Sequence, residues 1–96
     1  MKMDSSRIFT QNQKIVYREE DDGAFLFDPD TGDLRYMNHT GKEAFAMLMG
    51  DKDIEQIIDR LVQLYPEVER SRMQTDVEVF LMDLEQRHII LPLNSQ

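Results

Sequence analysis

Hydrophobic and polar residues alternate over residues 24–28 and 33–37, and the run between them, Asp-Pro-Asp-Thr-Gly, predicts a tight turn. An earlier run at residues 15–19 is rich in β-branched and aromatic side chains, and an acidic turn ending in Gly23 follows it. These segments predict a meander of three antiparallel strands. Because the last strand leads directly into a helical pattern, we expect it at the edge of a small sheet, where a second peptide can complete its unpaired N–H and C=O groups.

After residue 39 the apolar spacing changes to the helical period, which indicates helices. Residues 40–43, Thr-Gly-Lys-Glu, have the form of a capping box and predict the start of the first helix, and Gly50 marks its end. Asp53 is the predicted N-cap of a second helix, which Pro66 ends. The apolar positions of that helix recur at i, i+3, i+4 and i+7, as expected for one buried face: Ile54, Ile57, Ile58, Leu61, Val62 and Tyr65.

A third helix is predicted to begin near Ser71, with Val79 and Met82 outside its apolar stripe. The stripe itself contains Met73, Val77, Phe80, Leu81 and Leu84. Residues 89–91 are apolar and short, which fits either a packed tail or one more small strand. Residues 1–13 are polar and without periodicity, so we expect a flexible N-terminal arm followed by one domain over residues 14–93.

The fold class predicted from these elements is α+β, with a three-stranded antiparallel sheet followed by three helices. The second and third helices are joined by a short connection at residues 66–70, and with the small sheet they have the proportions of a winged helix-turn-helix. The fold resembles that of DNA-binding proteins, but the net charge of −8 over the 96 residues argues against DNA binding. The third helix, which would read DNA, carries Asp76, Glu78, Asp83 and Glu85, and their charge repels phosphate.

Residues with catalytic or metal-binding chemistry are sparse. The chain has no cysteine, and its two histidines, His39 and His88, lack ligand-spaced partners. The aspartates between residues 28 and 33 are explained by turn formation. No phosphate-binding glycine loop and no nucleophile–base pair is present, so we expect no enzymatic activity, no metal and no cofactor. Without a signal-peptide core or an apolar run of about 18 residues, the sequence predicts a soluble cytoplasmic protein with no membrane partner.

The order of motifs over residues 14–91 resembles the PqqD-like family, related to coenzyme PQQ synthesis protein D. A hydrophobic strand is followed by FDPDTG, a strand ending in MN, TGKEAF, GD, IEQIIDRLVQLY and DVEVFLMDL. The resemblance implies a RiPP recognition element, a non-catalytic adaptor for ribosomally synthesised and post-translationally modified peptides. Such an adaptor binds the leader peptide of a precursor and presents it to a modifying enzyme, such as a radical SAM enzyme or a protease-like or cyclase partner.

The resemblance also implies where the leader binds: as an additional strand against the third strand, in a cleft shared with the third helix. The corresponding residues are Asp33, Leu34, Arg35, Tyr36 and Met37 on the strand, and Asp76, Val79, Phe80 and Asp83 on the helix. If Leu34 and Tyr36 face the core, Arg35 points to the outer face, where an acidic leader residue can pair with it.

Two positions depart from the family pattern. Phe45 stands where the family commonly has tryptophan, and residues 87–90, Arg-His-Ile-Ile, replace a glycine-leucine-leucine ending, so the last helix lacks a glycine for a left-handed cap. Two other functions stay open from the residues. One is a winged-helix nucleic-acid or transcription-related protein, which the negative charge disfavours. The other is a protein–protein module that forms a homodimer through the same strand edge.

Overall fold

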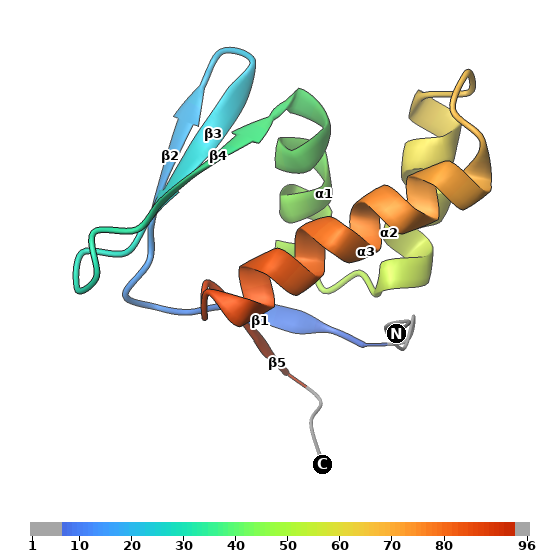
Figure 1. The fold of residues 1–96 in the computed structure, drawn as a ribbon. Coiled ribbons are helices and arrows are strands. Elements are labelled where there is room, and N and C mark those ends of the chain that lie inside the picture. The colour runs from blue at the N-terminus through green and yellow to red at the C-terminus, as the bar shows by residue number, and fades with distance from the viewer. Residues whose placement is uncertain (1–6, 94–96) are drawn as a thin grey trace.

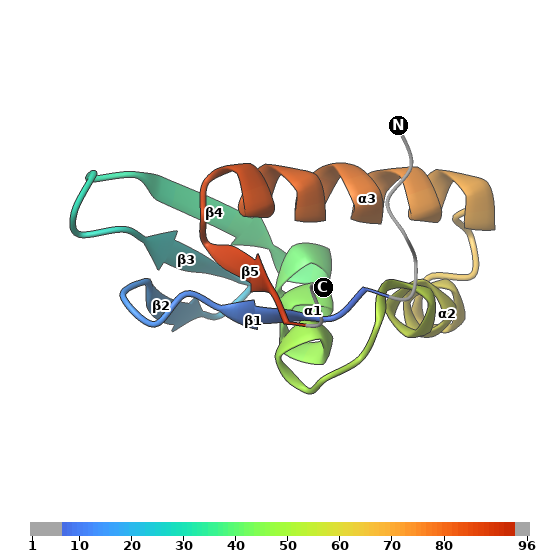
Figure 2. The same ribbon diagram turned by 90° about the horizontal axis from the view of Figure 1, so that it is seen from below.

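The computed structural model describes residues 7–93, in which a small three-stranded sheet lies at one end of a group of three helices and packs against the first of them (Figure 1). A second, two-stranded sheet joins the two ends of the described chain (Figure 2). The elements in chain order are β1 (Phe9–Gln11), β2 (Val16–Glu20), β3 (Gly23–Phe27), β4 (Leu34–Asn38), α1 (His39–Met49), α2 (Ile54–Leu64), α3 (Arg70–Gln86) and β5 (Ile90–Pro92).

The predicted meander is confirmed, with antiparallel strands in the order β2-β3-β4. The turn between β3 and β4 is closed by a bond from the Gly32 amide to the Asp28 carbonyl at 2.8 Å, and Gly32 has a φ of 79° that suits glycine. The Asp28 side chain also accepts from the Asp30 amide at 2.9 Å. β4 occupies one edge of this sheet and α1 begins at the next residue, as the sequence predicted. The whole arrangement is compatible with a winged helix-turn-helix.

The N-terminal segment is the main departure from the prediction. Residues 9–11 form β1, which pairs antiparallel with β5 at the other end of the chain, and Figure 2 shows the two strands side by side. Phe9 is only 1% exposed, and the Asn12 amide donates to the Ile89 carbonyl at 2.9 Å. Residues 9–11 thus form a paired strand within the segment that the sequence was expected to leave as a flexible arm over residues 1–13. Residues 1–6 lie outside the described part of the chain.

The helix starts were predicted with mixed success. The α1 helix begins before the predicted capping box, because the Asn38 side chain accepts from the Gly41 amide at 2.9 Å and is the N-cap. At α2 the predicted N-cap is confirmed: Asp53 and Gln56 form a reciprocal capping box. The α3 helix begins at Arg70 without a side-chain cap.

Two helices end on a left-handed residue that is not glycine. After α3, His88 has a φ of 59°, and the amides of His88 and Ile89 donate to the carbonyls of Glu85 and Leu84. These are the two bonds of a Schellman motif, so the motif forms although the glycine is missing. After α1, Asp51 has a φ of 67°, so Gly50 precedes the left-handed position.

The core lies between the small sheet and the helices and continues between α1, α2 and α3. Tyr17 of β2 stacks on the buried Phe45 of α1 with ring centroids 5.6 Å apart, which secures the sheet to the helices. No helix within residues 7–93 is long and apolar enough to cross a membrane. The buried face of α3 consists of four members of the predicted stripe, Met73, Val77, Leu81 and Leu84, while the fifth, Phe80, is partly buried.

Candidate functional site

The backbone of β4 leaves every second residue unpaired at the sheet edge. In the β3–β4 ladder Leu26 lies opposite Arg35, and the Asp28 amide donates to the Asp33 carbonyl at 2.9 Å. Because bonding alternates along an antiparallel pair, Arg35 bonds back to β3, whereas Leu34 and Tyr36 direct their N–H and C=O groups away from the sheet. Among the described strands none pairs with this side of β4. The edge therefore presents regularly spaced donors and acceptors.

A groove of about 590 Å³ runs beside this edge, between β4 and α3. Most of its lining residues are apolar, and the charged ones are Arg35, Glu67 and Asp76. Arg35 bonds Asp83, and Asp76 lies about two turns earlier on α3, so Arg35 and the two carboxylates lie toward opposite ends of the groove. The lining residues come from β4, α1, α2, the α2–α3 connection and α3: Arg35, Tyr36, Asn38, Thr40, Gly41, Ala44, Leu61, Tyr65, Glu67, Val68, Met73, Asp76, Val77 and Phe80. An extended chain along β4 can therefore form backbone bonds on one side and place alternate side chains in an apolar cavity.

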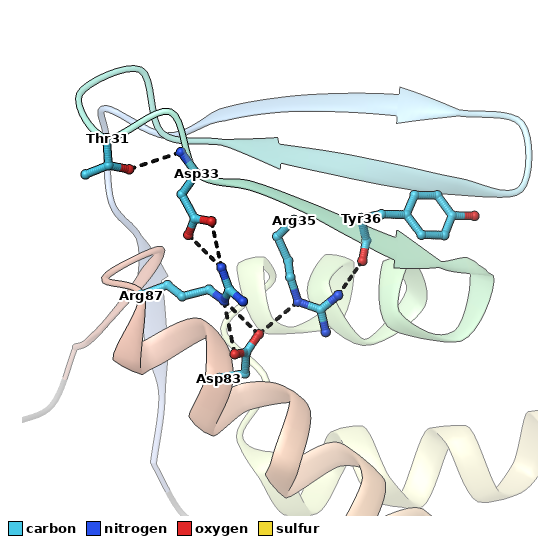
Figure 3. Close-up of polar contacts among 6 residues, drawn as sticks. All are labelled: Thr31, Asp33, Arg35, Tyr36, Asp83 and Arg87. Atoms are coloured by element: carbon cyan, nitrogen blue, oxygen red, sulfur yellow. Dashed lines mark hydrogen bonds and ion pairs between the residues drawn. The ribbon is translucent and has the colours of Figure 1, made fainter.

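Ion pairs connect β4 to the C-terminal half of α3 at the Arg35 end of the groove (Figure 3). The Arg35 Nε donates to Asp83 at 2.8 Å, and Arg87 donates to both Asp33 oxygens at 2.7 Å and to Asp83 at 3.0 Å. Arg35 Nη1 also donates to the Tyr36 carbonyl oxygen at 2.7 Å. That carbonyl lies on the free edge, so Arg35 caps an acceptor that an added strand would otherwise occupy.

Asp83 stays ionised to lower pH than an ordinary aspartate. Partial burial raises its pKa, but the hydrogen bonds from Arg35 and Arg87 oppose this effect, and the net result is a pKa below the usual value. At neutral pH the carboxylate therefore holds both guanidinium groups. This arrangement fixes the distance between the strand edge and the helix on which the groove depends.

The predicted strand residues fall on both faces of the sheet. Arg35 faces α3, and its guanidinium carbon lies 6.0 Å from the centre of the Phe80 ring, whereas Leu34 is 58% exposed and Tyr36 44% exposed on the opposite face. The condition under which Arg35 would point to the outer face, that Leu34 and Tyr36 face the core, is thus not met. The inward positions of β4 are those of Arg35 and of Met37, which is 1% exposed.

The predicted helix residues are also divided. Asp76 and Phe80 line the groove, and Asp83 binds Arg35 at its end. Val79 is 62% exposed and does not line the groove, because it lies outside the stripe that α3 turns toward the core. The sequence reasoning missed much of the wall, including Gly41, Tyr65, Glu67, Val68 and Met73. Tyr65 and Met73 belong to recognisable helical stripes, but only the packing of α2 against α3 brings them beside β4.

The comparisons with known proteins agree with this fold. The family model for coenzyme PQQ synthesis protein D (PqqD) matches residues 23–90, while no curated protein matches the chain significantly. Among solved structures, TbiB1 in complex with the TbiA(beta) leader peptide is similar, with a TM-score of 0.76 and 22% identity over 91% of this chain and 98% of that chain. Lasso peptide synthetase B1 complexed with the leader peptide has a TM-score of 0.76 and 21% identity over 88% of this chain and 98% of that chain. Since the family model matches more than half of its residues, the chain belongs to the PqqD family.

Proposed function

We propose that this protein is a RiPP recognition element: a non-catalytic adaptor that binds the leader of a ribosomally synthesised precursor peptide and presents it to a modifying enzyme. The single observation that carries the proposal is the uncovered edge of β4 beside the groove under α3. The enzyme is expected to be a radical SAM enzyme or a protease-like or cyclase partner. The two similar solved structures are described as leader-peptide complexes, which supports a leader as the ligand here.

The proposed binding mode is strand addition. The leader extends the β2-β3-β4 sheet by one strand and bonds to the free N–H and C=O groups of Leu34 and Tyr36. One leader N–H replaces the Arg35 guanidinium on the Tyr36 carbonyl. Arg35 keeps its bond to Asp83, so only part of its hydrogen bonding is exchanged. Backbone bonds of this kind supply affinity with little demand on leader sequence.

Side chains of the leader supply the sequence preference. Neighbours across a sheet point to the same face, so the leader residue opposite Met37 points toward α3 and enters the groove near Phe80. An apolar side chain suits that position. The residue opposite Arg35 meets the guanidinium and favours a carboxylate, whereas Glu67 and Asp76 favour a basic residue at the other end. A leader fits the groove if it presents an acidic side chain to Arg35, an apolar side chain beside Met37 and a basic side chain to Glu67 and Asp76.

The experiment that tests the function is a calorimetric titration with the leader of the precursor peptide encoded beside the gene. We expect the wild-type chain to bind, and Arg35→Glu to lose about tenfold in affinity or more, because a charge-assisted contact is replaced by a carboxylate facing Asp83. Circular dichroism establishes that the variant is folded. Binding that is equal in the folded variant and the wild type contradicts the proposed groove.

Two matched controls separate the groove from general charge and surface effects. Arg18→Glu makes the same charge change on β2, where the side chain is 77% exposed and distant from β4's free edge. Val79→Asp adds a carboxylate to α3 outside the groove. We expect both variants to keep wild-type affinity. If Val79→Asp weakens binding as much as Arg35→Glu, the peptide lies on the exposed side of α3 and the binding site is a different one.

A further inference from the structure

The face of the small sheet that points away from the helices is apolar and uncovered. Val16 of β2, Phe27 of β3 and Leu34 of β4 are direct cross-strand neighbours and form a row on this face. Arg18, Phe25 and Tyr36 form a second row beside it, in which the Phe25 and Tyr36 ring centroids lie 5.2 Å apart and the exposed Arg18 pairs with Glu20. We call the five apolar residues of these two rows the outer face.

The outer face is exposed to solvent, and a glycine beside it leaves space for the Tyr36 ring. Val16 is 52% exposed, Phe27 38% and Leu34 58%, and no element within residues 7–93 packs over them. Gly23 precedes Phe25 on the same face of β3, and a Cβ there would collide with the Tyr36 hydroxyl and the Met37 carbonyl, so glycine allows the Tyr36 ring to lie along the strands. Val16, Phe27, Leu34 and Tyr36 each expose about half of a side-chain area of roughly 200 Å², so the exposed patch measures about 400 Å². Apolar patches of this size on monomers are often functional.

The charges around the outer face indicate the kind of partner. The turns at both ends of the sheet are acidic, and the exposed Asp21 and Asp22 form the β2–β3 turn. Five carboxylates against two cations leave a local net charge of −3: Glu20, Asp21, Asp22, Asp28 and Asp30 against Lys14 and Arg18, while Glu19 and Lys42 pair with each other on the helix side of the sheet. A complementary surface is therefore apolar in its centre and basic at its margins.

A second copy of this chain does not fit that description. It carries the same acidic turns and a net charge of −8, so two outer faces repel each other. A bound leader enlarges the face, because the leader side chains opposite Leu34 and Tyr36 point to this side of the sheet. Partner and leader would then share one continuous surface.

We propose that the outer face docks a second protein whose contact surface is apolar in the centre and lined by lysine or arginine, while the leader occupies the groove. Within the proposed function this protein is the modifying enzyme, and to that extent the inference rests on that function. The two sites lie on opposite sides of β4, so one domain can hold leader and enzyme at once. Contact between the enzyme and the outward leader side chains makes binding of the two cooperative.

The test uses two synthetic helical peptides of about 16 residues with the same leucine face. One carries lysines and the other glutamates along the margins of that face, and each is titrated into the full chain while amide shifts are followed by NMR. We expect the lysine peptide to shift the amides of Val16 and Phe27, and the glutamate peptide to bind at least about tenfold more weakly. Shifts confined to the groove, or equal binding of both peptides, overturn the proposal.

A matched pair of variants tests the position. Val16→Lys and Val79→Lys make the same change at valines that are 52% and 62% exposed, the first on the outer face and the second on α3. We expect Val16→Lys to weaken lysine-peptide binding about tenfold or more and Val79→Lys to leave it close to the wild-type value. Equal effects of the two variants overturn the proposal. Phe27→Lys repeats the test at a second position of the outer face, with the fold checked by circular dichroism.

Two further readouts distinguish this inference from its rivals. Val16→Lys leaves leader binding at β4 intact, so loss of peptide docking with retained leader binding separates the two sites. If the leader binds away from β4 while the lysine peptide still binds the outer face, the proposed function is contradicted and the docking surface is supported. Sedimentation that reveals a dimer of the wild-type chain, and a monomer of Val16→Lys, assigns the outer face to a second copy and overturns the proposal.

Discussion

At the scale of single residues, His88 and Asp51 hold left-handed backbone positions that favour glycine. A side chain there costs about 1–2 kcal/mol, less for aspartate, whereas glycine loses somewhat more entropy on folding. We predict that His88→Gly raises the free energy of unfolding by about 0.5–1 kcal/mol and Asp51→Gly by less. Urea denaturation measures this. Ala46→Gly in exposed helix is the control and should lower it by about 1 kcal/mol; a destabilised His88→Gly would show that the imidazole makes a stabilising contact.

Asp83 gives the fold a pH dependence. Its folded-state pKa is lowered, so its contribution is complete above the unfolded pKa of about 3.9 and is lost as pH falls through the lower folded value. We predict that Asp83→Asn lowers the free energy of unfolding at pH 7 by at most about 1 kcal/mol, since the pair is partly exposed. The difference from wild type should shrink below about pH 4.

Urea denaturation at pH 7 and pH 3 decides this point. Glu67→Gln removes one negative charge from the other end of the groove, where Glu67 is exposed. It should unfold like the wild type at both pH values. A loss in Asp83→Asn that is as large at pH 3 as at pH 7 would mean that the side chain acts through packing and not through its charge.

At the scale of elements, β1 is the strand that the sequence patterns did not predict. Three residues with one buried side chain carry no periodicity, and the partner strand β5 lies at the far end of the chain. Alternation, capping and turn chemistry are local signals, so they correctly predicted the meander and the three helices. The pairing of β1 with β5 depends on contacts distant in sequence, which no local pattern contains.

We predict that Phe9→Ala lowers the free energy of unfolding by about 3–5 kcal/mol, the usual cost of deleting a fully buried aromatic side chain. Leu91→Ala on β5 is the control: its side chain is 39% exposed, and the loss should stay near 1 kcal/mol. Thermal and urea unfolding measure both variants. A Phe9→Ala protein as stable as the wild type would contradict the packing of β1 against the core and favour a flexible arm at residues 9–11.

At the scale of the whole molecule, the groove depends on a face assignment that the sequence left conditional. Alternation in β4 was visible, but Leu34 and Tyr36 are apolar and Arg35 is charged, so the usual rule places them on the wrong faces. The ion pairs of Arg35 with Asp83 and of Arg87 with Asp33 reverse that rule, because they compensate charge next to the core. The apolar residues displaced to the other side create the outer face. The groove and the outer face thus both follow from the orientation of β4, which turns Arg35 toward α3 and Leu34 and Tyr36 away from it.

The central claim, strand addition at β4, is tested most directly by amide hydrogen exchange of the full chain with and without the leader. In the free protein the amides of Leu34 and Tyr36 should exchange faster than those of Phe25 and Leu26 in the central strand, because no strand of the described chain pairs with them. With the leader, Leu34 and Tyr36 should slow by about tenfold or more, with Arg35 changed less. Protection confined to residues 66–72, with β4 unchanged, would contradict strand addition.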